Sequence, residues 1–274
     1  MNKILEVENL SYSWGENEVF QNLNFSVENN KVIAILGKNG AGKTTLLKCI
    51  NRILQPMSGN VKIDSKDISS LDLVELSKMV SYVPQSIMSN FPMEVFDVVL
   101  LGRRPHINWT IGDVDREKVS ETLKFFNLED FAFRNFNQLS GGERQRVIVA
   151  KAVSQDSSIF LMDEPTSDLD LKNQIEIMKK IKALVSDNDR GKAAIIAIHD
   201  INIAARFADF IFLLDKGEIR AKGTPEEVLT EKNIEQVFGV TSEVMPKTRK
   251  DPMRILIKDE LSDKQKTVKK NDRK

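Results

Sequence analysis

The chain has little of three things that often fix a protein's surroundings: cysteine, an excess of one charge, and long apolar runs. Its single cysteine, Cys49, excludes an internal disulfide and fits a reducing compartment. Lys and Arg together number 40, as do Asp and Glu, so no net charge draws the chain to nucleic acid or to a membrane surface. The longest apolar runs, such as 98–101 and 193–198, are far shorter than the roughly 20 residues of a membrane-spanning helix. The first residues also lack the apolar core of a secretion signal. We therefore expect a chain that acts at a membrane only through a partner.

A glycine-rich loop that ends in lysine and threonine is the strongest motif. It follows a uniformly apolar run, 32–36, as expected for a strand buried on both faces, and apolar residues at helical spacing come after it. The loop fits the pattern G-x-x-x-x-G-K-[ST] and consists of Gly37, Lys38, Asn39, Gly40, Ala41, Gly42, Lys43, Thr44 and Thr45. A chance match in a glycine-rich turn is the alternative, and the flanking strand and helix argue against it.

Each part of such a loop has a physical task at a phosphate group. Backbone N–H groups and the positive end of the helix dipole attract the anion, and the glycines let the backbone come close to it. Lys43 would reach the β- and γ-phosphates, and the Thr44 hydroxyl would bind Mg²⁺. The sequence therefore predicts a site for a nucleoside triphosphate.

Polar residues follow three other strand-like apolar runs. The runs are 79–83, 159–162 and 193–198, and they are followed by Gln85, by Asp163 with Glu164, and by His199, respectively. Because parallel strands end at the same edge of a sheet, we expect these side chains to share one site with the loop. Asp163 would hold Mg²⁺, Glu164 would deprotonate the attacking water, His199 would contact the γ-phosphate or the water, and Gln85 would ligate Mg²⁺ or water. Taken singly, each has a plain structural alternative, such as a helix cap, a structural histidine or a loop glutamine.

The order of apolar patterns predicts the fold class. Strands that alternate with helices indicate an α/β fold with a mainly parallel sheet covered on both sides. Alternating residues at 4–10 and 22–27 predict antiparallel strands near the N-terminus, whereas 93–153 is mostly helical. From about Thr241 the pattern decays, and the lysine-rich end, 264–274, is expected to be disordered.

A second anion-binding segment precedes a helix in the middle of the chain. The segment Leu139-Ser140-Gly141-Gly142-Glu143-Arg144-Gln145 has a serine hydroxyl and exposed glycine N–H groups before that helix. It resembles the signature motif of the ATP-binding-cassette (ABC) ATPases, and the resemblance extends in order and spacing up to about Gly239. Because the chain has only one lysine-bearing loop, we do not expect a second nucleotide in it.

The resemblance implies an architecture and a pair of cofactors. We expect a P-loop NTPase (RecA-like) core with a mainly parallel sheet, an N-terminal antiparallel β-subdomain and an inserted helical subdomain. The ABC ATPase domain would span 1–240, with the core at about 1–86 and 156–240 and the insertion at about 87–155. A C-terminal extension would follow at 241–274. The domain would bind ATP and Mg²⁺ and hydrolyse the ATP.

The resemblance also implies a head-to-tail dimer of two copies. Ser140 and Gly142, with Gly141 between them, would contact the γ-phosphate held by the loop of the other copy. Ser167 and Asp170 would line the seam between the copies. Asp168 departs from the family, which often has a small apolar residue at that position.

The resemblance also implies that one aromatic residue stacks on the adenine of ATP. Trp14 occupies the matching position, and its flat indole suits the task. Tyr12 is the alternative stacking residue, and a Trp14 packed in the core is the structural alternative.

The helical segment at 92–106 resembles that of importer ATPases for ferric siderophores, haem and cobalamin. Related zinc and manganese importers can carry a similar stretch. We interpret Arg103 and Arg104 as a solvated basic surface and His106 as a structural histidine. We expect the region 86–91 to form part of a groove that receives a helix of a membrane subunit.

An importer ATPase of this kind would have defined partners. They are a second copy of itself, two membrane-spanning permease subunits and, indirectly, an extracytoplasmic substrate-binding protein, with the chain on the cytoplasmic face of the cell membrane. No nucleic acid is expected. The rival interpretation is a soluble ABC ATPase that acts on nucleic acid or ribosomes, supported only by the lysine-rich end, and a third is a stand-alone nucleotide sensor.

Overall fold

A computed structural model describes residues 3–85, 92–167, 169–186 and 191–261. Its centre is a six-stranded sheet in the order β10-β9-β3-β8-β7-β6, in which all neighbours are parallel except β10 and β9. The strands are β3 (Lys31–Leu36), β6 (Val80–Val83), β7 (Ile159–Asp163), β8 (Ala193–Ala197), β9 (Phe210–Asp215) and β10 (Glu218–Gly223). The predicted α/β fold with a mainly parallel sheet is confirmed.

The central strands are apolar throughout because both of their faces are covered. Along β3, Val32, Ala34 and Leu36 pack into one apolar cluster, and Ile33 and Ile35 pack into another on the opposite face. This alternation follows from the two-residue period of a strand. The covered faces keep water away from the sheet and leave its polar carboxyl edge as the place where ligands can approach.

A four-stranded antiparallel sheet lies beside the central one, in the order β2-β1-β4-β5. Its strands are β1 (Lys3–Trp14), β2 (Asn17–Glu28), β4 (Ser58–Ile63) and β5 (Lys66–Asp67). Helix α1 (Lys43–Ile50) lies between β3 and β4 in the chain, and η1 (Ile68–Ser70) and α2 (Leu73–Met79) lie between β5 and β6. The antiparallel strands expected near the N-terminus are therefore present, and they are longer than expected. Cys49 on α1 is buried, and burial raises the pKa of its thiol to about 12.

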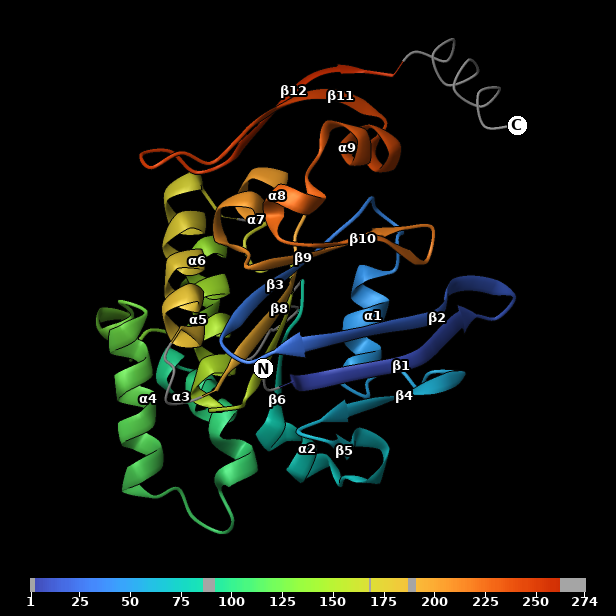
Figure 1. The fold of residues 1–274 in the computed structure, drawn as a ribbon. Helices are drawn as coiled ribbons and strands as arrows, with labels where there is room; N and C mark the ends of the chain where they lie inside the picture. Colours follow the sequence, from blue (N-terminus) through green and yellow to red (C-terminus); the bar gives the residue numbers. More distant parts are fainter. Residues whose placement is uncertain (1–2, 86–91, 168, 187–190, 262–274) are drawn as a thin grey trace.

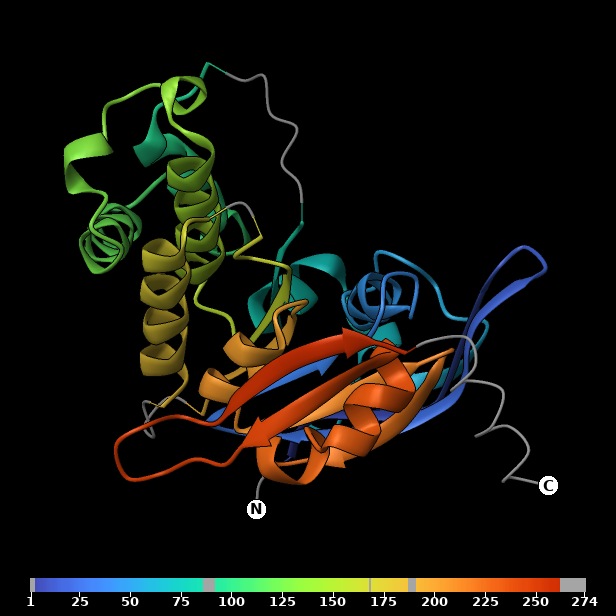
Figure 2. The same ribbon diagram turned by 90° about the horizontal axis from the view of Figure 1, so that it is seen from above.

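Helices fill the chain between β6 and β7 and gather to one side of the sheets (Figures 1 and 2). They are α3 (Val95–Leu100), η2 (Leu101–His106), α4 (Asp113–Phe125), η3 (Glu129–Phe131), η4 (Phe136–Gln138) and α5 (Gly141–Ser154). The expectation of a helical middle is confirmed. The boundaries between core, insertion and extension stay a prediction.

The interpretation of Arg103 as part of a solvated surface is wrong. Arg103 is buried, its Nε donates to Asp115 Oδ1 at 3.1 Å, and its Nη1 donates to the carbonyl of Ser154 at 2.9 Å. The guanidinium joins three helical segments because a buried charge needs such partners. His106 has a structural contact, with Nε2 lying 2.8 Å from the carbonyl oxygen of Gln155.

The last part of the chain contains elements that the sequence pattern did not predict. After α6 (Leu171–Val185), α7 (Ile201–Phe207), α8 (Pro225–Val228) and α9 (Glu231–Phe238), two antiparallel strands form a hairpin, β11 (Val240–Met245) and β12 (Arg254–Glu260). The sequence pattern decays from about Thr241, yet the chain forms these two strands up to Glu260. The periodic signal is weak because Met253 and Ile255 are buried while the neighbouring Leu256 and Ile257 are exposed. The lysine-rich end, 264–274, lies outside the described residues.

Over the ranges that the structure describes, none of the helices combines the length and the apolarity needed to cross a lipid bilayer.

Candidate functional site

The phosphate loop leaves β3 and runs directly into α1. Gly42 precedes the helix with a φ of 96°, which is the left-handed region that favours glycine. A Cβ at Gly42 would also lie 2.9 Å from Val19 Cγ1, so the close approach of β2 requires glycine there. The helix has no side-chain cap at its N-terminus, and its first N–H groups therefore face the loop. This arrangement is a ready anion site.

Lys43 lies folded into the loop that it terminates. Its Nζ donates to the carbonyl oxygens of Gly37 at 2.8 Å and Lys38 at 3.1 Å, and the residue is 5% exposed. Burial lowers the pKa of Lys43, and the nearby carboxylates of Glu164 and Asp163 oppose that shift. The loop thus holds a cation at its centre at the cost of partial desolvation.

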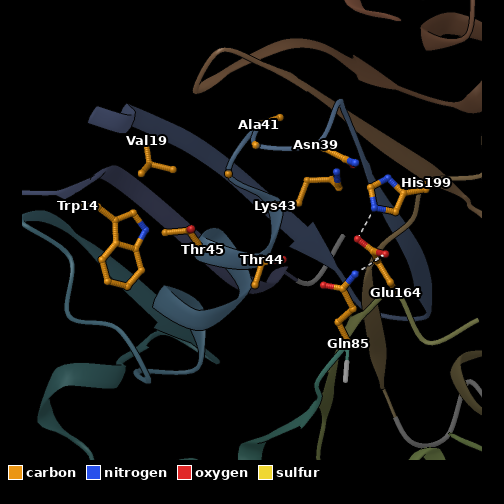
Figure 3. A pocket seen from close by; sticks show the side chains of 12 residues that line it. Trp14, Val19, Asn39, Ala41, Lys43, Thr44, Thr45, Gln85, Glu164 and His199 are labelled. Carbon is orange, nitrogen blue, oxygen red and sulfur yellow. Dashed lines mark hydrogen bonds and ion pairs between the residues drawn. The ribbon is translucent and has the colours of Figure 1, made fainter. Parts of the chain in front are cut away.

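A cavity of about 390 Å³ opens over the loop. Its lining residues are Trp14, Val19, Asn39, Gly40, Ala41, Gly42, Lys43, Thr44, Thr45, Gln85, Glu164 and His199. Figure 3 shows Trp14 at one end and Gln85, Glu164 and His199 at the other, with Lys43 and Thr44 between them. The fold therefore brings the loop and the predicted polar residues Gln85, Glu164 and His199 into one cavity.

Asp163 ends β7 and lies beneath the start of α1. Thr44 Oγ1 donates to Asp163 Oδ1 at 3.0 Å, and the Tyr82 hydroxyl lies 3.4 Å from Asp163 Oδ2. Asp163 is 1% exposed, and burial together with this carboxylate raises the pKa of Tyr82. A threonine hydroxyl beside a buried carboxylate is a pair of oxygen donors of the kind that a hard divalent cation prefers.

Glu164 is held between two other predicted residues. Gln85 Nε2 donates to Glu164 Oε2 at 2.9 Å, and His199 Nε2 contacts Glu164 Oε1 (dashed lines in Figure 3). The backbone of Glu164 has a φ of 51°, which costs a non-glycine residue about 1–3 kcal/mol and tends to occur at functional sites. Its N–H donates to the carbonyl of Ala197 at 3.0 Å, so β8 helps to hold this conformation. The carboxylate is therefore fixed and faces the loop.

Trp14 lies at the tip of the β1–β2 hairpin, and 54% of its surface is exposed. The alternative of a core-packed Trp14 is wrong. Its ring meets that of Tyr12 edge-on, with centroids 5.2 Å apart and planes at 79°. Tyr12 itself is only 8% exposed and is not part of the cavity lining, so it is poorly placed to stack on a ligand.

Ser140, Gly141 and Gly142 do not line the cavity in the described part of the chain. Ser140 caps α5, and its Oγ donates to Glu143 Oε2 at 2.8 Å while the Glu143 N–H points back to Ser140 Oγ at 3.4 Å. A Cβ at Gly141 would meet nothing within 4 Å, and one at Gly142 would lie 3.2 Å from a Leu169 methyl group. The segment therefore presents an open surface away from the loop of its own chain.

Within the described part of the chain, the contacts of the two residues expected at the seam between copies are local. Ser167 Oγ lies 3.2 Å from the carbonyl oxygen of Glu164, and Asp170 caps α6 by accepting from the Asn173 N–H at 2.8 Å. Asp168 lies outside the described residues.

Two residues of the site were missed by the sequence reasoning. Tyr82 contacts the buried carboxylate, and its position in the strand before Gln85 is a signal that could have suggested it. Val19 lines the cavity from β2, and no local motif points to it, because its place depends on how the antiparallel sheet packs on the loop.

This geometry agrees with a comparison against known families. The sequence profile described as "ABC transporter" matches residues 20–167 of the chain. The chain belongs to the ABC transporter family. As an ABC ATPase it binds and hydrolyses ATP, and the glycine loop, the strand-end acids and the signature segment all lie within the matched range.

Curated relatives of this ABC ATPase cover most of its length. It is 48% identical over 237 residues to the ABC transporter ATP-binding protein MJ0089 of Methanocaldococcus jannaschii, with 86% of this chain and 92% of the relative covered. It is 34% identical over 238 residues to the petrobactin import ATP-binding protein YclP of Bacillus subtilis, with 87% and 94% covered. It is 33% identical over 234 residues to the cobalamin import ATP-binding protein BtuD of Halobacterium salinarum, with 85% and 58% covered.

Solved structures share the fold of this ABC ATPase. A chain assigned to a metal-chelate type ABC transporter, in an inward-facing conformation, matches with a TM-score of 0.81 at 30% identity, covering 94% of this chain and 98% of the other. A dimeric post-hydrolysis cassette named MJ0796, bound to ADP and Pi, matches with a TM-score of 0.71 at 31% identity, covering 81% and 98%. The expected P-loop NTPase fold, with a parallel core and an antiparallel N-terminal sheet, is confirmed.

Proposed function

We propose that this ABC ATPase is the ATP-hydrolysing subunit of an importer for an iron complex, such as a ferric siderophore or haem, or for cobalamin. The observation that carries the catalytic part is the Glu164 carboxylate, held by Gln85 and His199 above the phosphate loop. The cargo class is supported by the petrobactin and cobalamin importers among the relatives and by the helical segment at 92–106.

The roles of the side chains follow from their positions. The N–H groups at the start of α1 and the Lys43 ammonium would bind the β- and γ-phosphates, and Trp14 would stack on adenine. Glu164 would accept a proton from water as the water attacks the γ-phosphorus in line, and the bond to the ADP oxygen would break. His199 would orient that water and contact the γ-phosphate. Positioning and charge neutralisation would supply most of the rate.

A magnesium ion fits the donors at the base of the loop. Thr44 Oγ1 and Asp163 Oδ1 are 3.0 Å apart, and the Gln85 amide oxygen points away from Glu164 and toward Thr44 (Figure 3). These residues would hold Mg²⁺, which supplies charge neutralisation to the phosphates when bound. In the described residues, no group of three or more His, Cys, Asp or Glu could hold a metal ion by itself.

We further propose that two copies form a head-to-tail dimer with composite ATP sites. The exposure of Ser140 and Gly141 supports this, since these two residues and Gly142 do not line the cavity over the loop of their own chain. The dimeric cassette bound to ADP and Pi is a relative of the same fold. ATP would close the dimer, and hydrolysis with phosphate release would let it open again.

The opening and closing would drive two membrane-spanning permease subunits. The chain would sit on the cytoplasmic face of the membrane through them, and an extracytoplasmic substrate-binding protein would deliver the cargo. The region 86–91, expected to receive a permease helix, lies outside the described residues. The cassette would not touch the cargo itself.

Purification of the full chain from membranes, together with whatever it retains, tests this proposal. We expect permease subunits to co-purify, and vesicles reconstituted with them and the binding protein to accumulate a ferric siderophore, haem or cobalamin in an ATP-dependent manner. Uptake of zinc or manganese would reassign the cargo to the related metal importers. Salt-sensitive binding of nucleic acid without any permease would overturn the proposal in favour of a soluble ABC ATPase.

A further inference from the structure

The C-terminal hairpin is fastened to α7 by one asparagine side chain. Asn202 Oδ1 accepts from the Ile255 N–H at 2.8 Å, and Asn202 Nδ2 donates to the Ile255 carbonyl at 3.1 Å. Although Asn202 is an exposed residue, both halves of its amide are committed to one backbone position of β12. The side chain thus pairs with the strand as a neighbouring strand would.

The fastened strand is itself well anchored. Ile255 is 5% exposed and Met253 is 3% exposed, and both belong to the apolar cluster that covers one face of the central sheet. β11 packs on α9 and β12 on α7 (Figures 1 and 2). At the far end of the hairpin, the Leu261 N–H donates to the carbonyl of Gly239 at 3.0 Å. The hairpin is therefore a fixed support for Asn202.

The start of α7 lies only two residues beyond His199. The tether from β8 to α7 consists of Ile198, His199 and Asp200. The Ile198 N–H donates to the carbonyl of Ile35 in the central sheet at 3.1 Å. At the other end, Asp200 Oδ1 accepts from the N–H groups of Asn202 and Ile203 at 2.7 and 3.1 Å. A short tether that is fixed at both ends determines the backbone position of the residue between them.

Packing does little to fix the His199 ring. Its side chain is 42% exposed, and its Nε2 contacts Glu164 Oε1. The direction of the ring therefore depends on where the tether holds the His199 backbone, and the amide of Asn202 secures one end of that tether.

We propose that Asn202 is a positioning residue for hydrolysis, which acts through His199 by locking the first turn of α7 to the C-terminal hairpin. The proposal rests on the proposed role of His199. The backbone of Ile255 in β12 then supports the hydrolysis site, because it supplies the N–H and the carbonyl that Asn202 holds. A loosened tether moves the ring away from Glu164 and from the γ-phosphate without touching the loop that binds ATP.

The test is the steady-state ATPase activity of the full chain carrying Asn202→Ala. We expect kcat to fall about tenfold, because misplacing a reacting group by a fraction of an ångström is costly, and KM for ATP to change less than about twofold. Asn202→Asp keeps the oxygen that accepts from Ile255 and loses the donor, so it should give an intermediate kcat. Two matched controls should leave kcat unchanged. Asn233→Ala removes an amide that donates to the Val228 carbonyl at 2.8 Å, and Lys258→Ala breaks an ion pair with Glu243 within the hairpin at 2.7 Å.

A double-mutant cycle with His199→Ala separates positioning from general loosening. Single-turnover hydrolysis with the protein in excess measures the slow variants. If Asn202 acts through His199, Asn202→Ala causes no further loss in the His199→Ala background. Additive losses, an unchanged kcat in Asn202→Ala with a native thermal transition, or an equal loss in Lys258→Ala would each overturn the proposal. A normal rate in His199→Ala would instead overturn the proposed role of His199 itself.

Discussion

Two segments of this ABC ATPase place glycine N–H groups at the N-terminal end of a helix, and their surroundings differ. The loop before α1 is exposed at residues 38–40 but is enclosed where it enters the helix: Lys43 is buried, Gly42 is pressed against Val19, and Asp163 accepts from Thr44. The segment Ser140–Gly142 at the start of α5 is open: a side chain at Gly141 would meet nothing within 4 Å, and Ser140 bonds to Glu143 of its own helix cap. Both segments offer backbone N–H groups to an anion, but only the loop before α1 has a buried cation beside those groups.

This difference indicates where the ligand of the open segment comes from. An enclosed anion site has its counter-charges within the chain, so it can hold a nucleotide by itself. An open site with equally good donors has no such partners, and a phosphate brought by a second copy is the ligand that its chemistry fits. Four experiments test the difference between the two segments.

The largest effect is expected at the enclosed site, from Glu164→Gln. The amide keeps the shape and can still contact Gln85, but it cannot take a proton from water, so kcat should fall by about 10²–10⁴-fold. ATP binding should persist, and the ATP-bound variant should run as a dimer in size-exclusion chromatography. Glu117→Gln on the exposed face of α4 is the matched control. If Glu164→Gln released phosphate at the normal steady-state rate, Glu164 would not be the general base.

The open site is tested by mixing two inactive variants. Gly141→Glu fits the free space and suits the first turn of a helix, so the fold should be stable, while its charge repels an approaching phosphate. Lys43→Ala removes the cation of the loop. Each alone should lose hydrolysis, and an equal mixture should regain roughly a quarter of the normal rate, because half the dimers would carry one intact composite site. A mixture that stays inactive, although both variants dimerise, would contradict sharing between copies.

A smaller effect is expected at the exposed end of the enclosed site. Trp14→Ala should raise KM for ATP by up to about tenfold, since an aromatic stacking contact contributes about 0.5–1.5 kcal/mol, and kcat should hardly change. Trp14→Phe should keep most of the affinity. Titration with a fluorescent ATP analogue measures both variants. If Trp14→Ala bound the ATP analogue with unchanged affinity, Trp14 would not be the residue that stacks on adenine.

The smallest effect is expected at an ion-pair cluster beyond the C-terminal end of α5, the helix that the open segment begins. Asp156 follows α5, and its Oδ1 lies 3.4 Å from Lys118 Nζ on α4 and 2.7 Å from Lys192 Nζ beside β8. Burial would raise the pKa of Asp156, but these two cations together outweigh it and lower the pKa to about 2.

Asp156→Asn should lower the free energy of unfolding at pH 7 by about 1 kcal/mol, a modest figure because the carboxylate is partly solvated. Because the folded-state pKa is depressed, this contribution is present above the unfolded pKa near 3.8 and is lost as the pH falls toward 2. Urea unfolding of both proteins from pH 7 to pH 3 should show a constant difference that shrinks below about pH 4. A difference that does not vary with pH would mean that the charge is not what matters, and Asp130→Asn serves as an exposed control.

Much of the site could be predicted because its parts are short and local. A glycine loop between an apolar run and a helix, and acids at the end of another apolar run, are read from neighbouring residues. The positions of Gln85 and His199 at strand ends follow from the rule that parallel strands finish at one edge. The burial of Arg103 and the contact of Tyr82 with Asp163 could not be predicted in this way, because their partners are 12 to 81 residues away along the chain.

The sequence alone therefore determined the α/β fold, the phosphate loop and the family of this protein. Those features depend on contiguous patterns and on the burial of apolar runs. Three features are visible only in the folded chain. Gln85 and His199 both contact Glu164, and Ser140 and Gly141 at the start of α5 are exposed. In addition, β12 pairs with the Asn202 side chain. The physical reason is that these contacts join elements far apart in the chain, and their geometry exists only when the packing of the sheets and helices is complete.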